Sequence, residues 1–524
     1  MTHKAYLAVD MGASSGRHVL GLFDGNKLQI EEVYRFENGP VEADGRLYWD
    51  LLEQWTRVRQ GLRAAAEKCK HVASVGVDAW GVDFGLLAGG DELLGNPYHY
   101  RDSRTNGMME KAFEIVPREE IFRHTGLQFM QLNTLYQLLA MKLAGSPLLD
   151  AAETLLMVPD LFHWLLTGVK CNEMTEASTS QFFNPVKGGW ATELLEKFSL
   201  PTRILGRIEQ PGTTLGPLRP NLVAETGLEG TKVVLPGSHD TASAVMAVPS
   251  SGKPGERPDW CYISLGTWAL MGVESPRPVV NDAVLRLNFT NEGGVGGTTR
   301  LLKNIAGLWL VQECRRAWNL SGANLDWEAL NRLGAAAPPL RRFVNPDAPD
   351  FLAPGDMPEA IAEFCRRTGQ AAPEDKGAVL RCALESIAMK FRRVFGMCEE
   401  LSKELSKGDR SDLCEAPSGP LCGKSDLSPS GGRIETIHVV GGGTRNRQLC
   451  QAAADACGRR VVTGPIEATA VGNLMMQALA DGEVSSIAEA REVIRRSFPV
   501  EEYEPQNTAA WDEGYGRFMK VVSG

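Results

Sequence analysis

The 524-residue sequence has no uninterrupted apolar run long enough to cross a bilayer, and its N-terminus has no apolar signal core. A spanning helix needs about 20 apolar residues, so we expect no membrane insertion or secretion, and a cytoplasmic location. An excess of positive charge is also lacking, because 55 Lys and Arg stand against 65 Asp and Glu, a net charge of −10. Nucleic acids and anionic membranes both attract concentrated positive charge, so the expected partners are small molecules.

The 11 cysteines are odd in number and include no Cys-x-x-Cys pair. They are expected to be mostly buried free thiols. Helical spacing at 357–367 and 377–407, joined by a turn at 368–375, predicts an antiparallel hairpin that brings Cys365 near Cys382. We expect a latent disulfide between them, without a catalytic role; the alternative is two unrelated buried cysteines.

The length exceeds what a single core usually holds, so two domains are expected. Residues 249–258 contain too much Pro, Gly and charge to continue either neighbour. They predict one domain at 1–248 and another at 259–524. Residues 408–433, rich in Gly, Ser and Pro, predict an exposed insertion in the second domain.

An acidic residue at the end of a strand gives the first chemical signal. The apolar run at 6–9 leads into Asp10 and a Gly/Ser turn, and a second apolar run at 19–23 predicts the partner strand of a hairpin. Small residues and backbone N–H groups in such a turn can approach phosphates, and Asp10 could hold hydrated Mg²⁺. The alternative is an ordinary Gly/Ser hairpin.

A similar hairpin occurs half a chain later, at 261–272, with Gly266 and Thr267 in its turn, and indicates a duplicated domain. Further strands are predicted at 28–36, 72–78, 283–289 and 437–440, and helices at 49–68 and 377–407. This order matches an α/β, two-domain actin-like ATPase (ribonuclease H-like) fold, with a nucleotide and sugar cleft between the domains.

Several sequence blocks carry a family resemblance over nearly the whole chain. They lie at 10–17, 76–83, 100–105, 133–138, 237–245, 264–271, 290–294, 303–305, 307–309 and 441–443. With these blocks the chain resembles the FGGY carbohydrate kinases, and those at 80–83 and 290–294 resemble the branch that acts on L-rhamnulose. The resemblance implies a first domain with the sugar site and a phosphate turn, and a second domain with the nucleotide site.

Asp240 is the candidate general base. It follows a predicted strand end and begins a small-residue helix, where a carboxylate could accept the proton of a sugar hydroxyl. The alternative is that Asp240 only caps that helix. The resemblance implies the catalytic role and adds a sugar site of Trp80, Gly81, His239, Asp240, Thr241 and Asn304.

The resemblance also implies that ATP is bound from both halves, with Asp10 holding the Mg²⁺. The implied nucleotide contacts are Ala13, Ser14, Ser15, Gly16, Arg17, Thr267, Gln312, Gly442 and Gly443. The protein is expected to be a monomer or a homodimer.

The activity that the resemblance implies is transfer of the γ-phosphate of ATP to O1 of L-rhamnulose, giving L-rhamnulose 1-phosphate in L-rhamnose catabolism. One alternative is a kinase for L-fuculose or another ketose or polyol. Another is a non-enzymatic, actin-like sensor of a sugar or nucleotide. Asp10, Asp240 and Thr267 together argue against a sensor, which has no need of a base.

Overall fold

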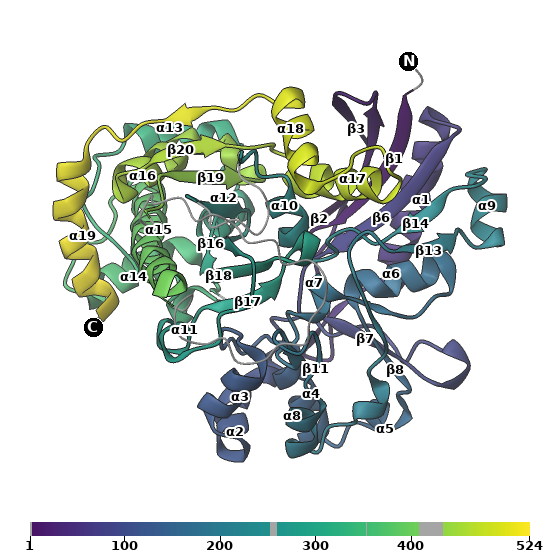
Figure 1. The fold of residues 1–524 in the computed structure, drawn as a ribbon. Coiled ribbons are helices and arrows are strands. Elements are labelled where there is room, and N and C mark those ends of the chain that lie inside the picture. The colour runs from purple at the N-terminus through teal and green to yellow at the C-terminus, as the bar shows by residue number, and fades with distance from the viewer. Residues whose placement is uncertain (1–2, 252–258, 353, 408–432, 524) are drawn as a thin grey trace.

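The computed structural model describes residues 3–251, 259–352, 354–407 and 433–523. Two mixed sheets organise the chain, one in each half, with helices packed on their faces (Figure 1). The first sheet contains, in spatial order, β13 (Thr214–Pro217), β14 (Lys232–Val234), β6 (Val72–Ala79), β1 (Lys4–Met11), β2 (Ser15–Phe23) and β3 (Leu28–Glu37). The second contains β17 (Thr290–Gly293), β18 (Thr299–Ala306), β16 (Trp268–Ser275), β15 (Trp260–Leu265), β19 (Thr436–Val440), β20 (Arg460–Thr463) and β21 (Glu502–Tyr503).

The two sheets share one core arrangement. In the first, β1, β2 and β3 pair antiparallel, while β6 and β14 add parallel strands on the other side of β1. In the second, β15, β16 and β18 pair antiparallel, while β19 and β20 add parallel strands beside β15. The repeated order confirms the predicted duplication and the two-domain α/β fold class.

The strand predicted at 283–289 is wrong. Residues Asp282–Leu287 form α11, and the third strand of the second sheet is β18. Apolar residues alternate here as in a strand, but the Asn281 side chain accepts a hydrogen bond from the Val284 backbone and caps a helix. Asn288 then ends the helix in the left-handed region, at φ 53°. Local capping by asparagine therefore overrides the period-two pattern.

Two helices join the halves across the centre of the molecule. α10 (Asp240–Met246) packs against both α17 (Ala468–Ala480) and β15, and α17 lies on β1 and β6 of the first sheet (Figure 1). At the crossing of α10 and α17, a Cβ on Gly472 would lie 1.8 Å from the Ser243 carbonyl oxygen. Glycine permits this close approach. A segment late in the chain thus covers the sheet formed by its beginning.

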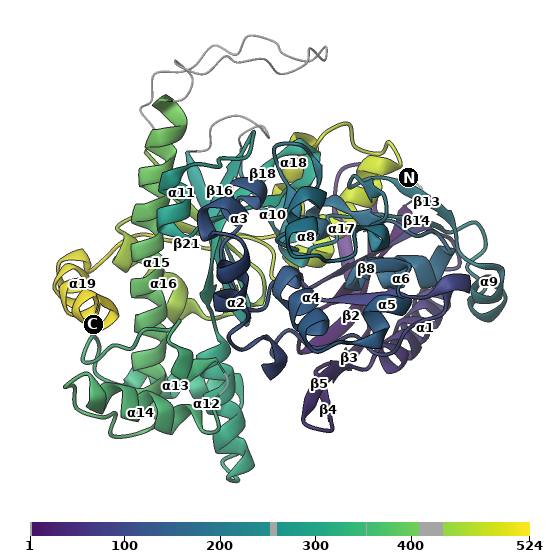
Figure 2. The same cartoon turned by 90° about the horizontal axis from the view of Figure 1, so that it is seen from below.

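The remaining helices cover the sheets and extend both halves. They are α1 (Leu51–Lys68), α2 (Met108–Ile115), α3 (Arg118–Thr125), α4 (Thr134–Leu143), α5 (Pro147–Ala151), α6 (Val158–Thr167), α7 (Met174–Ala177), α8 (Thr192–Lys197), α9 (Pro220–Thr226), α12 (Trp309–Leu320), α13 (Trp327–Ala336), α14 (Met357–Arg367), α15 (Lys376–Lys407), α16 (Arg447–Cys457), α18 (Ile487–Ser497) and α19 (Thr508–Ser523). Figure 2 shows α12, α13 and α14 gathered at one end of the long helix α15.

The predicted hairpin of α14 and α15 is confirmed, and its two cysteines meet. The Cys365 and Cys382 side chains hydrogen-bond each other, which lowers the pKa of Cys365 and raises that of Cys382. Both are free thiols in the structure. The latent disulfide stays a prediction.

The predicted domain limits, 1–248 and 259–524, also stay a proposal. Residues 252–258 of the expected boundary and nearly all of the expected insertion at 408–433 lie outside the described residues. Among the helices that the structure describes, none is long and apolar enough to span a bilayer.

Candidate active site

Three carboxylates come together where parallel strands of the first sheet end. Asp10 on β1 lies in register with Asp78 on β6, and Ala79 pairs with His239 immediately before Asp240. The carboxyl ends of parallel strands share one edge of a sheet, so residues far apart in the sequence meet there. Their surroundings give the three carboxylates different chemical properties.

Asp240 is the first residue of α10 and keeps 34% of its side-chain surface exposed. The helix N-cap is His239, so the alternative that Asp240 serves as the cap is wrong. Its Oδ1 accepts a hydrogen bond from Thr241 Oγ1 at 3.0 Å and lies 3.6 Å from His239 Nε2. Burial, reinforced by the charge of Asp10, raises the pKa of Asp240 above its ordinary value. A carboxylate with a raised pKa is a stronger base.

Asp10 is paired with an arginine. Its Oδ2 accepts hydrogen bonds from Arg17 Nε and Nη2, both at 2.8 Å, and Arg17 Nη1 also pairs with Glu467. The hydrogen bonds described thus engage Oδ2 of this cavity-lining carboxylate and leave its Oδ1 available to an ion. Mg²⁺ typically needs only one or two carboxylates besides water and phosphate oxygens, so Asp10 fits such an ion. Within the described ranges, no cluster of three or more metal-ligating side chains occurs.

Asp78 lies behind these two residues and is fully buried. Its Oδ2 accepts a hydrogen bond from Asn473 Nδ2 of α17 at 2.5 Å. Burial and the nearby charge of Asp10 raise the pKa of Asp78 well above its usual value, which favours the neutral acid. Asp78 does not line the cavity, and it links the first sheet to α17.

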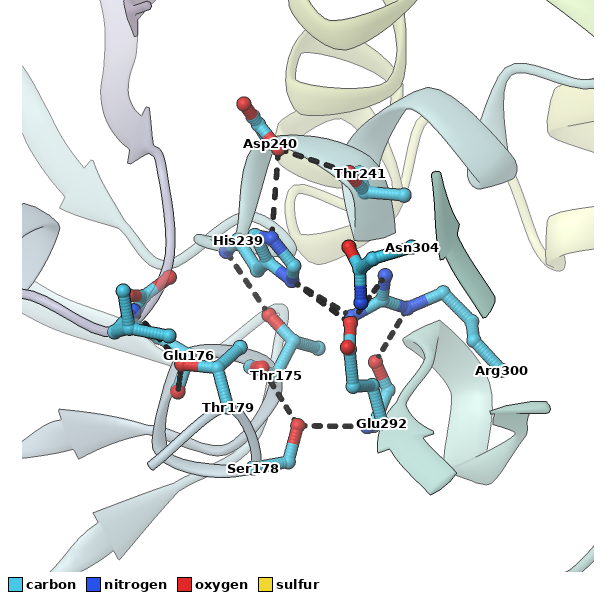
Figure 3. A network of polar contacts seen from close by, with 12 residues as sticks. Thr175, Glu176, Ser178, Thr179, His239, Asp240, Thr241, Glu292, Arg300 and Asn304 are labelled. Carbon is cyan, nitrogen blue, oxygen red and sulfur yellow. Dashed lines mark hydrogen bonds and ion pairs between the residues drawn. The ribbon is translucent and has the colours of Figure 1, made fainter. Parts of the chain in front are cut away.

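His239 connects Asp240 to a buried ion pair from the second half of the chain (Figure 3). Its Nδ1 lies 3.0 Å from Arg300 Nη2 and 3.3 Å from Glu292 Oε2. Because a guanidinium only donates hydrogen bonds, the shorter contact makes Nδ1 the acceptor. A neutral His239 then carries its proton on Nε2, the nitrogen that faces Asp240.

The ion pair of Arg300 and Glu292 also orients Asn304. Arg300 is fully buried, and its Nη1 lies 3.2 Å from Glu292 Oε2. Burial alone would raise the pKa of Glu292, but the charge of Arg300, with His239 and the Asn304 amide nearby, holds that pKa below its ordinary value. Glu292 is therefore ionised and holds the Asn304 amide at the cavity wall.

Helix α7 supports this network from below. Thr175 Oγ1 accepts from the His239 backbone at 3.1 Å, and Ser178 Oγ accepts from the Gly293 backbone of β17 at 2.7 Å (Figure 3). Glu173, just before α7, accepts a hydrogen bond from the Ser238 backbone at 3.0 Å. These contacts fix the segment that presents His239 and Asp240.

A cavity of about 320 Å³ lies between the two halves. The predicted site residues that line it are Asp10, Ala13, Ser14, Ser15, Arg17, Trp80, Gly81, His239, Asp240, Thr241, Thr267, Asn304, Gln312 and Gly442. Both hairpin turns therefore face one space. Each turn is closed by its own backbone, with Gly12 N donating to Ser15 O and Gly266 N to Trp268 O.

Two predicted nucleotide contacts do not line this cavity. A Cβ on Gly16 would lie 2.1 Å from the Phe36 ring, and a Cβ on Gly443 would lie 2.2 Å from Leu265 Cγ. Each glycine is thus required by packing next to the turn. The contacts of these two residues with the nucleotide stay a prediction.

Trp80 and Gly81 lie in one wall of the cavity, and the sequence predicts only part of what surrounds them. Trp80 lines the cavity but is 5% exposed, because its ring lies 3.9 Å from that of Trp49. The buried Asp83 accepts hydrogen bonds from both indole nitrogens and fixes this stack. A Cβ on Gly81 would lie 3.0 Å from Thr179 Cγ2, so Gly81 and Thr179 form a close contact at the wall.

Sequence reasoning missed several residues of this cavity. They include Val82, Gln128, Asn133, Thr179 and Glu292. Glu292 falls within the block at 290–294 and could have been chosen from it. Arg300, which directly precedes the apolar Leu301 and Leu302 in β18, is a second signal, because a buried charge usually has a partner.

Family models match both halves of the chain. The model for the N-terminal domain of the FGGY family of carbohydrate kinases matches residues 5–247, and that for the C-terminal domain matches residues 261–480. Curated relatives include a rhamnulokinase of Bacteroides thetaiotaomicron, 40% identical over 517 residues and 99% of both chains. A rhamnulokinase of Bacillus subtilis is 36% identical over 502 residues and 96% of both chains.

Solved structures share the fold at low sequence identity. Gluconate kinase from Lactobacillus acidophilus has a TM-score of 0.76 at 16% identity, over 99% of this chain and 98% of that one. Plasmodium falciparum glycerol kinase with ADP has a TM-score of 0.68 at 14% identity, with the same coverage. The sheets, the cavity between them and both family matches lead to one conclusion: the chain belongs to the FGGY family of carbohydrate kinases.

Proposed function

We propose that this kinase transfers the γ-phosphate of ATP to O1 of L-rhamnulose, giving L-rhamnulose 1-phosphate in L-rhamnose catabolism. Support comes from rhamnulokinases of several bacteria, which are 36–40% identical to this chain over nearly its full length. ATP as the donor follows from membership of a kinase family. Because this donor is supplied inside cells, we propose that the enzyme acts in the cytoplasm, as a monomer or a homodimer.

The observation that carries the mechanism is the position of Asp240. It lies on the wall of a cavity that also receives both hairpin turns and the Asn304 amide. In the proposed reaction, Asp240 accepts the proton of the sugar hydroxyl as its oxygen attacks the phosphorus. Thr241 and His239 hold the carboxylate in place.

The two turns would bind the triphosphate from opposite halves of the molecule. Ala13, Ser14 and Ser15 come from the first turn and Thr267 from the second. Asp10 would hold Mg²⁺, which when bound neutralises charge on the phosphates. Closure of the halves would exclude water, which otherwise competes with the sugar hydroxyl.

A coupled assay of ADP release across a panel of ketoses and polyols tests the substrate. We expect the highest kcat/KM with L-rhamnulose, and lower values with L-fuculose, D-xylulose and glycerol. A higher kcat/KM for L-fuculose would overturn the assignment of the substrate while leaving the kinase assignment intact.

A further inference from the structure

A second and larger cavity lies beside the proposed sugar site. Its volume is about 610 Å³, and it also lies between the halves of the chain. Residues 128–132 of the first half form one wall, and residues 346–352 with part of α15 form others. Trp268 and Trp309 contribute apolar faces. The proposed reaction uses no group that belongs to this cavity alone.

Positive charge dominates its lining. The described lining residues include five cationic side chains, Arg101, Arg286, Lys303, Lys390 and Arg393, and one carboxylate, Asp347. Lys390 pairs with Asp347 at 2.5 Å, and Arg286 pairs with Glu400 at 2.6 Å. Among the described residues, no carboxylate forms an ion pair with Arg101, Lys303 or Arg393, so their positive charges are not neutralised. This local excess contrasts with the net charge of −10 of the whole chain.

Arg101 has a buried donor that no protein group satisfies. Its Nη1 donates to the Leu352 carbonyl at 2.7 Å, while Nη2 is buried and has no hydrogen-bond partner within the described structure. The guanidinium lies 4.2 Å from the Trp309 ring centroid and 5.5 Å from that of Trp268. The aromatic rings thus hold the guanidinium in place. A buried donor without a partner is unfavourable, and an acceptor in the cavity would satisfy it.

Lys303 and Arg393 are also available to bind an anion in this cavity. Lys303 Nζ donates to the carbonyls of Leu287 and Asn288 at 2.8 and 2.9 Å, which leaves the third of its three protons. Burial, with Lys390 and Arg393 nearby, lowers the pKa of Lys303 to about 8. The charges of Lys303 and Arg393 thus repel each other, and an anion between them would relieve the repulsion.

The two cavities share a boundary. The residues that line both of them are Gln128, Met130, Leu132, Trp268 and Asn304. The Asn304 backbone and side-chain amides donate to Gln128 Oε1 at 2.9 and 3.3 Å. Asn304 is also the residue that Glu292 holds in the proposed sugar site. A ligand in the second cavity would lie against the other side of this boundary.

We propose that the second cavity binds a small sugar phosphate. Arginine and lysine donors match the oxygens of a phosphate monoester, and the two tryptophans with the neighbouring amides suit a polyhydroxylated carbon chain. The proposed site adjoins the catalytic cavity, and the proposal does not depend on which sugar the enzyme phosphorylates.

Calorimetric titration with L-rhamnulose 1-phosphate and, separately, with inorganic phosphate tests the site. The variant Arg393→Gln removes a charge that lines only the second cavity. Its matched control is Arg392→Gln, one residue earlier on α15, where Arg392 pairs with Asp512 at 2.7 Å. We expect Arg393→Gln to weaken binding of the sugar phosphate about tenfold or more, and Arg392→Gln and Arg393→Lys to leave it within a few-fold.

Equal binding by Arg393→Gln and Arg392→Gln would overturn the proposal, as would the absence of binding by the unaltered protein. Inorganic phosphate that binds as tightly as the sugar phosphate would contradict the sugar part. A thermal melt of each variant identifies any loss of folding, and Arg393→Lys tests the charge if Arg393→Gln unfolds. If the kinase assay shows no phosphorylation of L-rhamnulose, these binding results still stand. The two proposals can therefore fail separately.

Discussion

The carboxylates of Asp10, Asp78 and Asp240 lie close together, but their contacts suit them to different tasks. Asp10 is paired with Arg17, a permanent cation. Asp78 is fully buried, which favours its neutral form. Asp240 lines the cavity and is held by the hydroxyl of Thr241. Of these three, it is therefore the one suited to accept a proton from a substrate.

Asp240→Asn should lower kcat by about 10² to 10⁴-fold, because the amide keeps the shape of the side chain but cannot act as a base. Sugar binding should persist, so the loss should fall on kcat rather than on the affinity for sugar measured by calorimetry. Asp326→Asn is a matched control, since Asp326 caps α13 and asparagine can also accept from the Ala329 backbone. Turnover of Asp240→Asn equal to that of Asp326→Asn would contradict the role of the base.

Glu173 gives a pH-dependent prediction. Burial raises its pKa to about 8 from an ordinary value of 4.5. Between these values the folded protein holds a proton that the unfolded chain has lost. The contribution of Glu173 to the free energy of unfolding is therefore greatest below pH 4.5 and declines as the pH rises toward 8.

Unfolding of wild type and Glu173→Gln by denaturant at several pH values tests this. Glutamine does not titrate, so the stability of the wild type relative to the variant should fall between about pH 5 and 8, by up to a few kcal/mol. Glu193→Gln, at an exposed glutamate, should give a nearly constant difference. A constant difference for Glu173→Gln would show that the carboxyl group is not held protonated.

At the scale of secondary-structure elements, the crossing of α10 and α17 fixes the catalytic helix. Asn473 and Gln477 of α17 also reach the first sheet, where Gln477 Nε2 donates to Leu7 O at 2.9 Å and Oε1 accepts from Ser74 at 2.7 Å. The helix that begins with Asp240 is thus held between two halves of the molecule. Its position should be sensitive to small changes in volume at the crossing.

Gly472→Ala should destabilise the protein and reduce activity, because the new methyl group overlaps the Ser243 carbonyl and must separate the helices. Overpacking of this kind typically costs about 1–3 kcal/mol or more. Gly396→Ala is the matched control, since Gly396 lies within α15 and a Cβ there meets no atom within 4 Å. Alanine favours a helix, so this control should be neutral or stabilising. Equal thermal stability of the two variants would contradict the tight crossing.

The sequence predicts those elements that have a local pattern of residues. Apolar runs with turn residues predict both hairpins, and helical spacing predicts α1, α14 and α15. The same reasoning gives Asp10, Asp240 and Thr267 of the cavity. It fails at α11, where caps at Asn281 and Asn288 outweigh the alternation.

The contacts of the site that the sequence does not predict join residues that lie far apart in the chain. The contact of Glu292 with His239 joins residues 53 positions apart, and Asn473 reaches Asp78 from 395 positions away. No local pattern encodes such pairs, since they depend on how the two sheets face each other. At Gly16 and Gly443 the sequence also does not reveal that packing against Phe36 and Leu265 requires a glycine.

At the scale of the whole molecule, a cavity between two sheets predicts closure on ligand binding. Sugar and a non-hydrolysable ATP analogue together should reduce the radius of gyration in small-angle scattering more than either alone. The physical reason is that each half contributes one phosphate turn. An unchanged radius with both ligands bound, as verified by calorimetry, would contradict closure.

The central claim is that Asp240 promotes transfer of phosphate to O1 of L-rhamnulose. Phosphorus NMR of a reaction that contains L-rhamnulose and ATP, with wild type and with Asp240→Asn, tests it most directly. The account predicts stoichiometric formation of ADP and L-rhamnulose 1-phosphate by wild type, and formation slower by about 10²-fold or more with the variant. Phosphate on another oxygen, release of inorganic phosphate alone, or equal rates for the two proteins would contradict it.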